Sequence, residues 1–87
     1  MIDEKLLSVV ANRLLASLHE HEDHPDVREL LSNERFMSTV REAINGRIQV
    51  ARDLGMGRWS MESNLSDLKD VSDLFFQFTL ALQGRTW

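Results

Sequence analysis

The apolar residues near the amino terminus recur with the period of an α-helix. Six of them stand at positions i, i+3, i+4, i+7, i+8 and i+11: Leu7, Val10, Ala11, Leu14, Leu15 and Leu18. This spacing places them on one broad face of a helix, which we expect to span residues 3–22. The face is wide enough to be covered on two sides, as in the core of a helical bundle or the seam of a dimer.

Helix-start signals follow directly after this first helix. Pro25 fits the first position of a short helix at 25–32, because its missing N–H has no partner to lose there. Ser32 or Asn33 then supplies an N-cap for a third helix that begins at residue 34. The sequence therefore predicts two further helices that are joined with almost no linker.

The third helix has two possible ends, and the sequence leaves both open. The pair Asn45-Gly46 is either a break or a weak point that a helix tolerates at a cost of about 1 kcal/mol. A break separates a helix at 34–44 from another at 47–54. A tolerated pair gives one long helix over 34–54.

A last apolar stripe predicts helical structure over residues 58–83, ending at Gly84. This is either one helix or two, with a second start near Ser66. We therefore expect an all-α fold in a single domain, residues 1–87. It is either a small bundle of four to five helices with a helix-turn-helix-like segment, or a long antiparallel helical hairpin plus the amino-terminal helix.

The composition excludes several classes of protein. The chain has no cysteine, which excludes disulfide scaffolds and cysteine-ligated metal sites. No run approaches the roughly 18 apolar residues that a membrane span needs. The first residues, MIDEKLL, are acidic and lack the basic region of a signal peptide. We expect a cytoplasmic protein that binds no membrane.

Residues 19–26, HEHEDHPD, hold three histidines among four carboxylates. Imidazole and carboxylate groups suit zinc, nickel or iron. His19 and His21 would diverge by about 200° on a helix, and only His21 and His24 could share a face, beside the break at Pro25. We therefore expect a solvated connection that binds no metal and no cofactor. Metal binding or pH sensing by these histidines stays open as an alternative.

The net charge of −4 is unevenly distributed along the chain. Residues 35–58 are the positive part, with five arginines against Glu42 and Asp53. The planar guanidinium group suits phosphate oxygens and base edges. The alternative is that arginines spaced five or six apart point around a helix and only solvate it. The five arginines are Arg35, Arg41, Arg47, Arg52 and Arg58.

The apolar and glycine spacing of residues 47–65 is typical of a helix-turn-helix. Ala51 is small where the two helices would cross, and Gly55 allows the positive φ of the turn. Met61 and Leu65 would face back onto the first helix. The segment resembles the carboxyl-terminal helix-turn-helix of the Fis and NtrC-type DNA-binding proteins. The matching positions are Arg47, Gln49, Ala51, Leu54, Gly55, Met56, Arg58, Ser60, Met61 and Leu65.

This resemblance implies a small DNA-binding regulatory protein that acts as a dimer. Its partner would be double-stranded DNA. Four residues would contact phosphates or bases: Arg47, Gln49, Arg52 and Arg58. Three more would lie in the groove: Trp59, Ser60 and Ser63.

The closely spaced phenylalanines near the carboxyl terminus suggest a second function. Phe75, Phe76 and Phe78 cannot all face one core from one helix, so some apolar area is left for a second copy or another partner. The alternative is thus a non-enzymatic helical protein–protein interaction module, an adaptor, inhibitor or assembly subunit. No nucleophile stands at a recognisable spacing from a base, so we expect no enzyme. The expected self-association or partner-binding residues are Leu14, Leu18, Phe75, Phe76, Phe78 and Trp87.

Overall fold

The computed structural model describes residues 3–51 and 67–84. Four helices lie in these ranges, and the described residues contain no strand, which confirms the all-α fold. The helices are α1 (Glu4–Glu20), α2 (Pro25–Ser32), α3 (Glu34–Ile44) and α5 (Lys69–Leu82).

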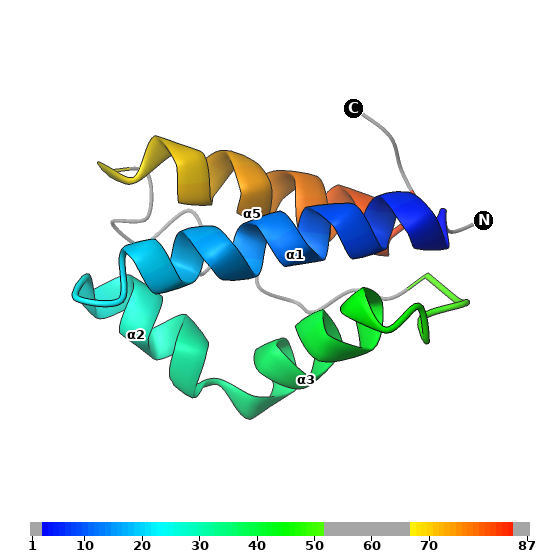
Figure 1. The fold of residues 1–87 in the computed structure, drawn as a ribbon, viewed down its shortest axis with the longest axis horizontal. Helices are drawn as coiled ribbons and strands as arrows, with labels where there is room; N and C mark the ends of the chain where they lie inside the picture. Colours follow the sequence, from blue (N-terminus) through cyan, green and yellow to red (C-terminus); the bar gives the residue numbers. More distant parts are fainter. Residues whose placement is uncertain (1–2, 52–66, 85–87) are drawn as a thin grey trace.

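The longest helix, α1, lies in the middle of the arrangement (Figure 1). Helix α5 packs along one side of it and α3 along the other, and α2 links the end of α1 to the start of α3. Both α3 and α5 run opposite to α1, so the start of α1 lies near the end of α3. A hydrogen bond that the Ser8 hydroxyl donates to the Ile44 carbonyl, 3.0 Å long, joins these two ends.

Side-chain caps define the starts of the first three helices. The Asp3 carboxylate accepts from the Leu6 N–H at 3.0 Å, and the Asn33 side chain accepts from the Phe36 N–H at 3.1 Å. Helix α2 has Pro25 in its first turn, as predicted, and a ring nitrogen of His24 as its cap. Each cap satisfies a backbone donor that the helix cannot satisfy itself.

The end of α3 decides between the two predictions made for Asn45-Gly46. Gly46 has φ +68°, its N–H donates to the Ala43 carbonyl, and the Arg47 N–H donates to the Glu42 carbonyl at 2.9 Å. This pair of bonds is a Schellman motif, which ends a helix with glycine in the left-handed conformation. The prediction of one continuous helix over 34–54 is therefore wrong, and with it the long helical hairpin.

The chain does not resume a helix immediately after this break. Residues 47–51 are irregular, so the prediction of a helix that begins at Arg47 is also wrong. At this point the Arg47 N–H closes α3, and the Ile48 side chain is buried in the core. The rest of the predicted helix-turn-helix, residues 52–65, lies outside the described residues.

Helix α5 begins later than predicted. Residues 67 and 68 are not part of it, so the prediction of a single helix over 58–83 is wrong. The alternative of a second helix that starts near Ser66 agrees with α5 to within three residues, since α5 begins at Lys69. Its capping residue is Leu68, which makes no side-chain cap hydrogen bond, and Ser66 lies outside the described residues. The predicted end is confirmed: Gly84 has φ +76° and its N–H donates to the Ala81 carbonyl.

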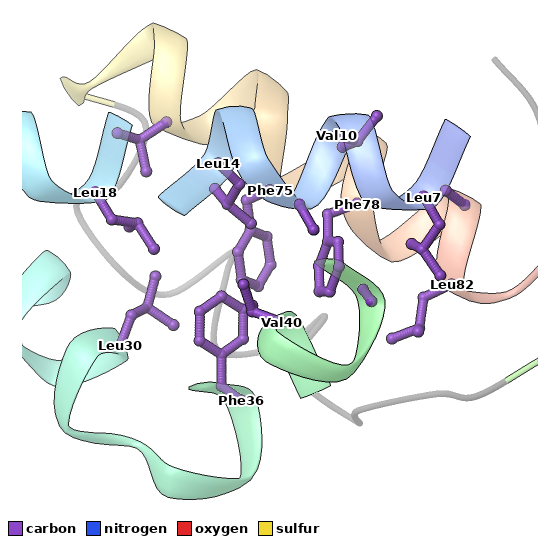
Figure 2. Close-up of a cluster of buried hydrophobic side chains, with 14 of the residues drawn as sticks. Leu7, Val10, Leu14, Leu18, Leu30, Phe36, Val40, Phe75, Phe78 and Leu82 are labelled. Atoms are coloured by element: carbon purple, nitrogen blue, oxygen red, sulfur yellow. The ribbon is translucent and has the colours of Figure 1, made fainter. Parts of the chain in front are cut away.

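The core lies between α1, α3 and α5 (Figure 2). Phe36 of α3 is fully buried and meets two rings of α5, with centroids 5.9 Å from Phe75 and 6.1 Å from Phe78. Aromatic pairs at such separations add to the stability that burial itself provides. The apolar stripe of α1 covers this cluster with Leu7, Val10, Ala11, Leu14 and Leu18.

This core overturns part of the predicted partner surface. Four of the side chains predicted to bind a partner are buried within a single copy of the chain, so they have no exposed surface for a partner to contact. Their assignment to self-association was wrong because the stripe of α1 is covered on its two sides by α3 and α5 of the same chain. They are Leu14, Leu18, Phe75 and Phe78.

Candidate binding surface

An exposed group of arginines lies on α3 and just after it. Arg35, Arg41 and Arg47 are all exposed, and none of them forms an ion pair with another of the described residues. Arg28 of α2 differs, because its side chain donates to the Glu22 carbonyl at 3.1 Å and lies 3.8 Å from the Asp23 carboxylate. Within the described part of the chain, no carboxylate therefore engages the guanidinium groups of these three arginines.

The fold of α3 explains why these side chains face solvent. Its buried face carries Phe36, Thr39, Val40 and Ala43, so neighbouring positions point away from the core. Arg35 and Arg41 are six residues apart, about 9 Å along the helix axis and about 120° around it.

Arg47 directly follows the end of α3, where its N–H bonds to the Glu42 carbonyl at 2.9 Å. The next residue, Ile48, is buried in the core, and Gln49 after it is exposed. We call Arg41, Arg47 and Gln49 the α3-end surface.

Of the seven residues predicted to contact DNA, the structure describes two, Arg47 and Gln49, and both are exposed in the chain that follows α3. The other five lie outside the described residues: Arg52, Arg58, Trp59, Ser60 and Ser63. Trp87, from the predicted partner-binding set, also lies outside them.

Exposed apolar side chains form a second kind of surface feature. Phe76 on α5 is 60% exposed, so the prediction that the three phenylalanines cannot share one core is confirmed. Val50, which follows the α3-end surface, is 74% exposed. The sequence reasoning did not single out Val50, which fell within the helix predicted over 47–54. Gly46 was the signal that α3 ends there. Because α3 ends there, Val50 lies in irregular chain.

A polar contact joins the end of α1 to the start of α5. The His21 ring Nε2 lies 3.1 Å from Asp70 Oδ2, and the Ser17 hydroxyl donates to the same oxygen at 3.3 Å. Glu20 lies beside them: one ligand atom from each of Glu20, His21 and Asp70 falls within 4.8 Å of the other two. Sequence reasoning considered the histidines but missed Asp70, which is 49 residues away from His21.

The environment of Asp70 lowers the pKa of its carboxyl group. Partial desolvation raises the pKa, but the hydrogen bond with His21, a hydrogen bond from the Val71 N–H and the charge of His21 together lower it below 3.8. The contact is half exposed, since the side chains of His21 and Asp70 are 32% and 48% accessible. The ionised carboxylate is therefore favoured in the folded state.

We expect the stabilising effect of Asp70 to disappear in acid. A carboxyl group whose pKa is lower in the folded state stabilises the fold above its unfolded pKa and loses that effect as the pH falls through its folded pKa. Urea unfolding of wild type and Asp70→Asn at about pH 6 and about pH 3 checks this. We expect a difference below about 1 kcal/mol at the higher pH, because the pair is half exposed, and a smaller one at the lower. An equal difference at both pH values would contradict the assignment.

Comparisons with known proteins do not place the chain in a family. No protein-family model matches it, and no curated protein or solved structure is similar to it. Among the described residues, no helix is long and apolar enough to cross a membrane. By its fold, the protein is thus a small all-α domain that carries the α3-end surface.

Proposed function

We propose that this chain is a small, non-catalytic DNA-binding protein that contacts duplex DNA through the α3-end surface. The observation that carries the proposal is the availability of Arg41 and Arg47, which are exposed and form no ion pair with another described residue. An arginine already held by a carboxylate would have to break that pair before it could bind a phosphate.

The chemistry of each side chain indicates which part of the duplex it would contact. The arginines would bind phosphate oxygens, which fix the position of a protein on the duplex. Gln49 is suited to read a base edge, since its amide both donates and accepts. Arg52 and Arg58 follow in the sequence, and we include them on the resemblance to the Fis and NtrC-type proteins alone. Self-association into a dimer would double the number of phosphate contacts.

The charge distribution agrees with a modest affinity. The chain as a whole carries −4, and acidic residues dominate its first 34 positions. Acidic surfaces repel the phosphate backbone, so non-specific binding should be weak and should need low salt. Specific contacts at the α3-end surface would then contribute most of the affinity.

The test is binding to a mixed-sequence duplex as a function of salt, followed by fluorescence anisotropy between about 50 and 200 mM salt. The double variant Arg41→Ala/Arg47→Ala should weaken binding and reduce the slope of log K against log salt by about 2, since each lost phosphate contact removes about 1. Arg28→Ala is the matched control for each single change, Arg41→Ala or Arg47→Ala, because it removes one positive charge from an arginine that already has a partner. No binding at low salt, or equal weakening by Arg28→Ala, contradicts the proposal.

One observation favours the alternative function of a helical protein-interaction module. Phe76 is 60% exposed on α5, in a domain whose core is filled by its neighbours Phe75 and Phe78. Exposed aromatic side chains are enriched among residues that anchor protein interfaces. If the duplex titration shows no binding, this surface becomes the leading candidate for the function.

A further inference from the structure

We propose that Glu20, His21 and Asp70 form a binding site for a divalent transition metal, with zinc as the ion that fits best. The site would lie where the end of α1 meets the first turn of α5. Each residue offers one ligand atom, and the three atoms lie within 4.8 Å of one another. The inference does not depend on the proposed DNA-binding function, which uses a different surface.

The spacing of the two central ligand atoms suits a tetrahedral ion. His21 Nε2 and Asp70 Oδ2 are 3.1 Å apart. An ion bound at about 2.0–2.1 Å in tetrahedral geometry holds its ligand atoms about 3.3 Å apart. A zinc ion could therefore take the place of the hydrogen bond with little movement of either side chain.

The third ligand and the fourth position complete an open site. Glu20 is exposed on the last turn of α1, so its carboxylate can rotate toward the ion without disturbing the core. Three protein ligands and one water molecule are typical of zinc sites that keep an open position. The surrounding connection adds negative charge through Glu22 and Asp23, which attracts a cation.

A hydrogen bond from Ser17 orients the Asp70 carboxylate. The Ser17 hydroxyl donates to Asp70 Oδ2 at 3.3 Å, and Ser17 is only 9% exposed. Ligating carboxylates in metal sites are commonly oriented by such outer hydrogen bonds. A carboxylate oxygen has more than one lone pair, so this bond leaves room for the metal.

The chemistry of the ligand set selects the class of ion. Calcium takes six to eight oxygen ligands and magnesium retains several waters in an octahedron. A single imidazole with two carboxylates offers too few oxygens for calcium and suits zinc or a neighbouring transition metal.

The other two histidines of this connection do not share the site. A ring nitrogen of His24 is used as the cap of α2, where it accepts from the Asp26 N–H at 3.2 Å. His19 is exposed, and its nearest carboxylate is that of Glu22 at 3.9 Å. His19 is therefore a matched control for His21: the same residue type, two positions away, outside the cluster.

The test measures zinc affinity directly on the full chain, by competition with a chromophoric zinc chelator. We expect one zinc per chain for the wild type, and an affinity at least about tenfold lower for His21→Ala and for Asp70→Asn. His19→Ala should bind as the wild type does. Cobalt(II) in place of zinc should give the visible absorption of a tetrahedral site, and Asp70→Asn should remove it. Circular dichroism confirms that each variant is folded.

Three results would overturn the proposal. These are the absence of saturable zinc binding by the wild type, wild-type affinity in Asp70→Asn, and a loss in His19→Ala as large as that in His21→Ala. The last two would mean that the exposed histidines bind zinc without the help of α5. Magnesium should not compete with zinc at the site, and competition by magnesium would contradict the assignment to a transition metal.

Discussion

Phe36→Ala is expected to lower the free energy of unfolding by about 3–5 kcal/mol. Phe36 is fully buried and is the residue of α3 whose ring packs between Phe75 and Phe78 of α5. Removing the ring leaves a cavity that well-packed neighbours fill only partly. A domain of this length has about 4–13 kcal/mol of stability in total, so the variant should be partly unfolded at moderate temperature.

Phe76→Ala is the matched control for this loss. It makes the same substitution on α5, but its side chain is 60% exposed, so the stability should change by no more than about 0.5 kcal/mol. Urea unfolding followed by circular dichroism measures both variants. Similar losses in the two would mean that the division of the phenylalanines between core and surface is incorrect.

The helix starts could be predicted from the sequence because they depend on residues that are neighbours in the chain. Asn33 caps α3 through a bond to Phe36, only three residues on. Pro25 begins α2 for reasons of its own covalent geometry. Such signals work locally, so no knowledge of the tertiary structure was needed to place α2 at 25–32.

The break at Asn45-Gly46 could not be decided in the same way. A glycine inside a helix costs about 1 kcal/mol, which tertiary contacts can easily outweigh in either direction. The outcome depends on two features that lie outside the pair, the bond from the Arg47 N–H to Glu42 and the burial of Ile48 in the core. The predicted helix at 47–54 is also not found over its first five residues, where Ile48 is buried in the core.

The division of the apolar residues between core and surface was also only partly predictable. Helical periodicity correctly indicated that Phe75, Phe76 and Phe78 cannot share one face. Periodicity alone could not say that the broad stripe of α1 is covered by α3 and α5 of the same chain, and it therefore assigned Leu14 and Leu18 to a partner. The contact between His21 and Asp70 joins residues 49 positions apart, and no local pattern could have indicated it.

Leu14→Ala is expected to lower the free energy of unfolding by about 2–5 kcal/mol. The side chain is fully buried at the middle of α1, where the helix meets both α3 and α5. Because the contacts that cover it belong to one chain, the loss should be independent of protein concentration. Thermal unfolding at two concentrations about tenfold apart should therefore give the same shift in Tm.

Leu15→Ala provides the comparison that separates a core from a dimer seam. Leu15 is adjacent to Leu14 and is only partly buried against the core, so its loss should be smaller than that of Leu14→Ala at every concentration. In a dimer seam, the effect of a substitution grows as dilution separates the subunits. If the Tm of the wild type falls on dilution and Leu15→Ala removes that dependence, α1 also contacts a second copy through its half-buried flank. If the Tm is constant, the stripe of α1 serves only the core of its own chain, and any self-association must use Phe76 or another exposed surface.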